Sequence, residues 1–82
     1  MKRVKKIALI AFHHEYNSFE YLVEVIRQVL GYETSQAANC ANIIYEKGSY
    51  ILKTFNKGDL EKASAYKELL HEHGIPAKIT TV

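Results

Sequence analysis

A short apolar run near the start of the chain, residues 7–12, constrains the fold more than any other stretch. It stops at three ionisable residues, His13, His14 and Glu15, and an amphipathic segment begins directly after them. Such a run bounded by polar residues predicts a central strand, from Lys5 to about Phe12, covered on at least one face. The strand end, the polar junction and the next helix therefore lie close together, where side chains and free helix N–H groups can meet a ligand.

The segment after the junction is the clearest helix of the chain. Asn17 lies three residues before Glu20, which is the spacing of a helix-capping pair, so Asn17 is the predicted N-cap. Gly31 is the predicted end of the helix. The apolar residues recur at helical spacing and form one broad face: Leu22, Val23, Val25, Ile26, Val29 and Leu30.

Four further elements follow by the same reasoning. A second helix, capped by Thr34 or Ser35, runs to about Lys47 and is stopped by Gly48; its alanines favour a compact hairpin with the first helix. The rest of the chain predicts a strand over 49–55, a turn over 56–59 with Asp59 as N-cap, a helix over 60–73 and a strand over 77–82. The order β-α-α-β-α-β predicts an α+β fold of two layers, with a three-stranded sheet covered by three helices.

Length and charge indicate a single domain spanning residues 1–82. The net charge is +2, and four basic residues lie within 2–6, so the rest of the chain carries −2. Residues 1–4 are a candidate disordered start. No basic stripe continues along an element, which argues against nucleic-acid binding. The single Cys40 fits a reducing compartment, and no stretch is long enough to span a membrane, so a soluble cytoplasmic protein is expected.

The sequence offers little for catalysis or metal binding. His13, His14 and Glu15 are adjacent, and neighbouring residues of an extended segment point in opposite directions, so solvated loop residues are the better interpretation. His71 and His73 suit the last turn of a helix, where cationic side chains are favoured. Cys40 is expected to pack as a small apolar residue. No enzyme, cofactor or metal is predicted.

The aromatic residues around the junction leave two interpretations open. Tyr16, Phe19 and Tyr21 flank the junction, and Tyr45 and Tyr50 bracket the end of the second helix. They can pack in the small core. Alternatively, the exposed helix ends frame a shallow apolar pocket with polar walls from residues 13–17.

Three stretches together resemble the ClpS family, the adaptors of the bacterial Clp protease. Residues 12–26 resemble the opening of these proteins, and residues 44–48 resemble the end of their second helix. The stretch Gly74-Ile75-Pro76 falls where the family often has Gly-His-Pro before its last strand. The resemblance covers roughly residues 5–80 and agrees with the predicted element order.

The resemblance implies a binding function. ClpS binds the bulky N-terminal residue of a substrate protein and hands it to the N-domain of an AAA+ unfoldase, ClpA or ClpC. The implied peptide-binding positions are His13, His14, Glu15, Asn17, Phe19, Ala41 and Tyr45. Of these, His13, His14 and Tyr45 stand where the family hydrogen-bonds the peptide's α-amino group, and Ala41 stands where it has a gating Met. The implied unfoldase-binding positions are Glu46 and Lys62.

This chain departs from the family pattern at the positions that should bind the α-amino group. A cationic amine favours a carboxylate, and His14 in place of Asp removes that attraction and reverses it at acidic pH. Tyr45 keeps a hydroxyl but lacks an imidazole. The resemblance therefore implies an adaptor that is divergent in its ligand pocket.

Two alternative functions remain open on the sequence. One is a protein-interaction module similar to the C-terminal domain of the ribosomal stalk protein, although that surface is typically rich in Lys and Gly, whereas the second helix here carries Ala37, Ala38, Asn39 and Asn42. The other is a metal-responsive regulator that uses His13 and His14.

Overall fold

The structure is a computed structural model that describes residues 6–81. Their elements follow the predicted order, with one short 3-10 helix added: β1 (Lys6–Phe12), α1 (Phe19–Leu30), α2 (Thr34–Lys47), β2 (Ser49–Asn56), η1 (Lys57–Asp59), α3 (Leu60–Glu72) and β3 (Ala77–Thr81). The candidate disordered start, residues 1–4, lies outside the described residues, as do Lys5, the predicted start of the first strand, and Val82, the predicted end of the last.

The three strands form one antiparallel sheet in the order β2-β1-β3, so β1 is central, as its apolar run predicts. The pairing of β1 with β2 shifts between Leu9 and Ile10. Leu9 pairs with Lys53 and Ile10 pairs with Ile51, which leaves Leu52 as the extra residue of a bulge. The bulge bends β2, the long strand that links α2 to η1.

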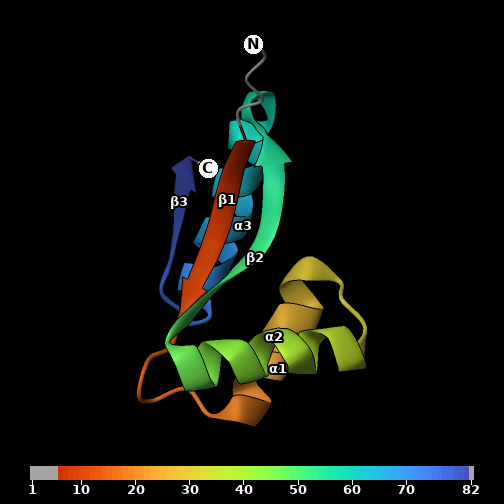
Figure 1. The fold of residues 1–82 in the computed structure, drawn as a ribbon, viewed down its shortest axis with the longest axis vertical. Coiled ribbons are helices and arrows are strands. Elements are labelled where there is room, and N and C mark those ends of the chain that lie inside the picture. The colour runs from red at the N-terminus through yellow and green to blue at the C-terminus, as the bar shows by residue number, and fades with distance from the viewer. Residues whose placement is uncertain (1–5, 82) are drawn as a thin grey trace.

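The helices are arranged in two places relative to the sheet (Figure 1). Helix α3 runs behind the sheet along one face, while α1 and α2 pack against each other at the end where β1 stops and β2 starts. The predicted α+β fold and the predicted pairing of α1 with α2 are confirmed. This arrangement gives the sheet two different ends, one closed by the helix pair and one at the start of β1.

The core lies between the inner face of the sheet and the helices. One face of α1 supplies Leu22, Val25 and Ile26, all almost fully buried, as its apolar spacing predicts. Ala37, Ala41 and Ile44 of α2 are also buried. The largest fully buried side chains are Leu9, Leu22, Ile26, Ile44, Leu70, Ile75 and Val25.

Two predicted helix caps are wrong. The N-cap of α1 is Ser18, whose hydroxyl accepts a hydrogen bond from the Tyr21 N–H at 3.1 Å, and Asn17 has another role. The N-cap residue of α2 is Glu33 rather than Thr34 or Ser35, and the Glu33 side chain makes no capping hydrogen bond. Asp59 does precede α3, but it makes no side-chain capping bond.

The predicted glycine stops are confirmed at the ends of α1 and α2. Gly31 and Gly48 have φ angles of 74° and 95°, in the left-handed region that favours glycine. Each donates its N–H to a carbonyl of the preceding turn, from Arg27 and Ile44 respectively, at 2.9 and 2.8 Å.

Candidate functional site

The junction after β1 is held by backbone hydrogen bonds to two other connections. The N–H of Phe12 donates to the Pro76 carbonyl and that of His13 donates to the Gly48 carbonyl, both at 2.9 Å. Within the loop, the Asn17 N–H donates to the His14 carbonyl at 2.8 Å. The loop over residues 13–17 is therefore tied to the ends of α2 and α3, which lie far away in the sequence.

Asn17 is used by the fold itself. Its side chain is 8% exposed, and its Nδ2 donates to the Gly74 carbonyl at 3.1 Å. The amide thus fixes the start of α1 to the turn before β3. Asn17 stays a predicted peptide-binding position, but its side-chain N–H already has a partner.

Three aromatic rings meet at the junction: His13 follows β1, Phe19 starts α1 and Tyr45 lies near the end of α2. We call these three residues the junction cluster. The His13 and Tyr45 ring centroids are 4.8 Å apart and those of Phe19 and Tyr45 are 6.4 Å apart, both in edge-to-face arrangements. Tyr45 is central to the cluster and yet half exposed. Ala41 lies one helical turn before Tyr45 and is fully buried. The structure thus brings four predicted positions together.

His13 contains an unusual polar atom. Its Nε2 is buried and has no hydrogen-bond partner among residues 6–81. A buried polar group without a partner costs free energy, and such groups concentrate at sites where a ligand or a movement satisfies them. The interpretation of His13 as a solvated loop residue is therefore wrong, because packing against Tyr45 half buries its side chain.

The next loop residues face solvent instead. His14 and Glu15 are exposed. The Nδ1 of His14 accepts the Tyr16 N–H at 3.2 Å, and the two rings lie 5.1 Å apart. Tyr16 is 84% exposed. His13 packs in the junction cluster whereas His14 and Glu15 face solvent, so the three adjacent ionisable residues do not share one environment.

The two predicted unfoldase-binding residues lie at opposite ends of β2. Glu46 belongs to the last turn of α2 and Lys62 to the first turn of α3, and both are exposed. The eight residues of β2 lie between these elements, and an extended strand of that length spans about 25 Å. One small contact patch cannot include both side chains.

Metal binding finds no support in the described residues. Within residues 6–81, no three side chains of the types His, Cys, Asp or Glu are placed to hold a metal ion. His71 and His73 hydrogen-bond to the carbonyls of Ala77 and Leu69 at 2.9 and 2.8 Å, which agrees with their predicted place at a helix end. Cys40 is buried, as predicted, and burial raises the pKa of its thiol.

A cavity that the sequence did not indicate lies at the opposite end of the sheet. It has a volume of about 360 Å³ and is lined by residues of β1, η1, α3 and β3. The one signal in its lining is Leu60, a large apolar residue that is 52% exposed at the start of α3. No helix in the described part of the chain is long and apolar enough to cross a membrane.

Comparisons with known proteins agree with the observed fold. A sequence model of the family described as ATP-dependent Clp protease adaptor protein ClpS matches residues 2–80. A search of curated proteins found no match. Among solved structures, Agrobacterium tumefaciens ClpS2 bound to L-phenylalaninamide superposes with a TM-score of 0.72 at 18% sequence identity, covering 98% of each chain.

Proposed function

The chain belongs to the ClpS family of Clp protease adaptors, and we propose that it binds substrate proteins by their N-terminal residue at the junction cluster and delivers them to a Clp unfoldase. Its role as a Clp adaptor follows from the family, whose members are generally not catalytic. The family also favours this role over the ribosomal stalk alternative. We place the adaptor in the cytoplasm, where a free buried Cys40 stays reduced.

The junction cluster is the observation that carries the proposal. Its three rings join the end of β1 to α1 and α2, and Tyr45, the central ring, is half exposed. Aromatic faces and edges suit a bulky side chain, and a ring face also attracts a cation such as an α-ammonium group. The L-phenylalaninamide bound to the ClpS2 relative carries both features, a free α-amino group and a benzyl side chain.

Access to the cluster requires Tyr45 to move. Tyr45 packs edge-to-face on both His13 and Phe19, and the Nε2 of His13 is buried beside it. A ligand that shifts the Tyr45 ring and packs against it would reach the space between these residues and give the buried His13 nitrogen a hydrogen-bond partner. The side chain of Ala41 on α2 is a methyl group, so no long side chain at that position obstructs entry of a ligand.

Fluorescence anisotropy with a labelled peptide tests the N-terminal specificity. A peptide that begins with Phe or Leu should bind, and the same peptide with an acetylated N-terminus should bind at least tenfold more weakly because it lacks the cationic amine. Tyr45→Ala should weaken binding about three- to tenfold, since an aromatic contact contributes about 0.5–1.5 kcal/mol. Tyr16→Ala, which removes an exposed tyrosine outside the cluster, is the matched control. Equal or absent binding of the free and acetylated peptides would end the proposal.

Delivery to an unfoldase is tested separately, by co-purification with the N-domain of a ClpA- or ClpC-type unfoldase. A standard interface covers about 800 Å² on each partner, a patch about 30 Å across. An interface of that size along β2 would include both Glu46 and Lys62, so Glu46→Lys and Lys62→Glu should each weaken retention. Full retention by both variants would remove these two residues from the interface, and no retention of the wild-type chain would contradict delivery.

A further inference from the structure

We infer that the cavity at the start of β1 is a second binding site, which takes a small apolar carboxylate, and that it is independent of the junction cluster. The cavity is lined by Lys6 and Ile7 of β1, Lys57 of η1, Leu60 of α3, and Ile79, Thr80 and Thr81 of β3. Its volume of about 360 Å³ is at the lower end of the range typical of small-molecule sites, roughly 300–1,000 Å³.

The walls of the cavity divide into an apolar part and a polar part. Ile7, Leu60 and Ile79 supply the apolar surface, and Leu60 stays 52% exposed in a chain whose other large apolar side chains are mostly packed. Thr81, which shares its face of β3 with Ile79, supplies a hydroxyl group. Apolar walls with a few convergent polar groups are the usual composition of a ligand site, and they favour a ligand with an apolar body and one polar head.

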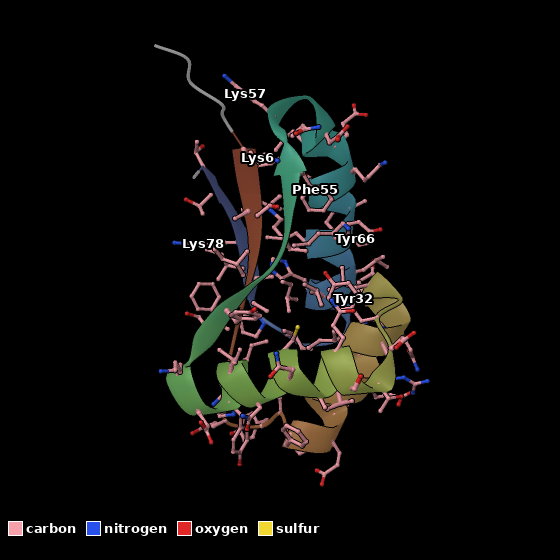
Figure 2. All side chains as sticks on the ribbon, turned by 45° about the vertical axis from the view of Figure 1, so that its right-hand side comes forward. Lys6, Tyr32, Phe55, Lys57, Tyr66 and Lys78 are labelled. Atoms are coloured by element: carbon pink, nitrogen blue, oxygen red, sulfur yellow. The ribbon has the colours of Figure 1, made fainter. Side chains whose placement is uncertain are left out.

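The charge of the polar part selects an anionic head. Both charged residues that line the cavity are lysines, Lys6 and Lys57, and Figure 2 shows them at the same end of the molecule, where β1 begins and β2 ends. No acidic side chain is among the described lining residues. The Lys57 ammonium group and the Thr81 hydroxyl can each donate to one oxygen of a carboxylate.

The residues next to the cavity in the sequence carry charges of both signs. The acidic neighbours are Asp59 and Glu61, both exposed and both outside the lining, and Lys62 follows them directly. The two lining lysines therefore supply the positive charge at the cavity itself, and this charge raises the local concentration of an anionic ligand.

Position separates this site from the junction cluster. Lys6 and Phe12 are the two ends of β1, and a strand of seven residues spans about 20 Å. No residue of the cavity belongs to the cluster. A ligand in the cavity can therefore bind while a peptide occupies the junction, and each site can be lost without the other.

The site is tested by titrating the isotope-labelled full chain with sodium octanoate and following amide chemical shifts by NMR. Octanoate should shift the amides of Lys57, Ile79, Thr80 and Thr81 saturably, and octan-1-ol, which has no charge, should bind at least tenfold more weakly. N-acetyl-leucine and its neutral amide form a second pair, because the same carboxylate chemistry occurs at the C-terminus of a peptide. Binding of either acid over its neutral partner supports the site and identifies the source of the ligand.

Variants of exposed residues make the result independent of folding. Lys57→Gln should weaken octanoate or N-acetyl-leucine binding at least fivefold, and Leu60→Glu, which adds a carboxylate at the rim, should abolish it. Lys47→Gln, at the exposed end of α2, should leave it unchanged. The inference is overturned if neither acid shifts these amides, if the neutral compounds bind equally well, or if Lys47→Gln weakens binding as much as Lys57→Gln does.

Discussion

The two ends of β1 differ in what fills them. At the end that leads into the junction, His13, Phe19 and Tyr45 pack on one another and Asn17 is bonded to Gly74. At the other end, strands and η1 surround a cavity of about 360 Å³ beside a half-exposed Leu60. The chemically rich sequence is thus at the closed end, whereas the open space lies among residues with no motif. The sequence motif marks the residues with ligand-binding chemistry, whereas the position of the cavity depends on where the strands and helices end.

The largest expected contrast between the two ends is in stability. Ile44 is fully buried in α2, one residue before Tyr45, whereas Leu60 is 52% exposed at the cavity. Ile44→Ala should cost about 2–5 kcal/mol of unfolding free energy through lost burial and a residual void. Leu60→Ala should cost less than about 1 kcal/mol, because much of its side chain is already in water. Urea unfolding followed by circular dichroism measures both variants.

A chain of this size has a small free energy of unfolding, so Ile44→Ala can leave it largely unfolded. Ile44→Val, which should cost about 0.5–1.5 kcal/mol, then supplies a readable value. A loss for Leu60→Ala above about 2 kcal/mol, the range expected for a buried leucine, would show that the cavity end is packed as firmly as the helix pair, and the contrast between the two ends would fail.

A smaller contrast concerns two asparagines. Asn17 is buried and donates to the Gly74 carbonyl at 3.1 Å, while Asn56 ends β2 beside the cavity and is exposed. Asn17→Ala should lower the unfolding free energy by about 1–2 kcal/mol, since it removes a buried hydrogen bond between two distant turns. Asn56→Ala should change it by less than about 0.5 kcal/mol. Chemical denaturation compares the two directly, and a larger loss for Asn56→Ala would contradict the assigned role of Asn17.

These contacts also show what could be predicted from the sequence. Helix α1 and its stop at Gly31 depend on local spacing and backbone conformation, and both were predicted. The N-cap residue was predicted wrongly, because Asn17 and Ser18 are both residue types that cap helices. Ser18 caps α1, whereas the Asn17 side chain is bonded to the carbonyl of Gly74, 57 residues further along the chain. Local patterns contain no information about such a partner.

The same distinction holds for the candidate site: its residues could be predicted, but the contacts between them could not. The family resemblance identified His13 and Tyr45 as candidate residues, but their ring contact, across 32 positions of the sequence, depends on the loop after β1 being held at the end of α2, where the His13 N–H donates to the Gly48 carbonyl. The cavity is less accessible still to sequence reasoning, since its wall combines the first residues of β1 with the last residues of β3 and the short helix η1. Lysine, threonine and isoleucine in ordinary strands give no local signal that they will meet.

Two substitutions of exposed residues, one at each end of β1, should each change ligand binding at that end only. His14→Asp places a carboxylate beside the junction cluster and should tighten binding of a Phe-starting peptide about five- to tenfold, because a charged hydrogen bond to the ammonium contributes roughly 1–1.4 kcal/mol even at an exposed position. The same variant should leave octanoate binding unchanged, while Lys57→Gln should weaken octanoate and leave the peptide unchanged. Anisotropy and NMR titrations of both variants complete the comparison. Parallel changes in the two affinities would mean that the ends are coupled.

The smallest expected effect concerns Tyr32, which joins the helix pair to the middle of β2. Its hydroxyl donates to the Leu52 carbonyl at 2.6 Å. Burial, and then the neighbouring Cys40, Tyr50 and Tyr66, raise the pKa of Tyr32 above its ordinary value. Tyr32→Phe should lower the unfolding free energy at pH 7 by about 0.5–1 kcal/mol, the contribution of one hydrogen bond.

The pH dependence of that difference follows from the direction of the Tyr32 shift. The folded chain keeps the phenolic proton at a pH where the unfolded chain has begun to lose it, so the stabilisation is complete below about pH 10, the ordinary pKa of tyrosine, and is lost as pH rises through the folded value. The wild-type advantage over Tyr32→Phe should therefore shrink above pH 10, because the ionised oxygen no longer donates to Leu52. Urea unfolding at pH 7, 9 and 11 measures the change, with Tyr16→Phe as the exposed control. A wild-type advantage that stays constant up to pH 11 would mean that the pKa of Tyr32 is not raised by folding, and no advantage at pH 7 would mean that the hydroxyl bond to Leu52 contributes nothing.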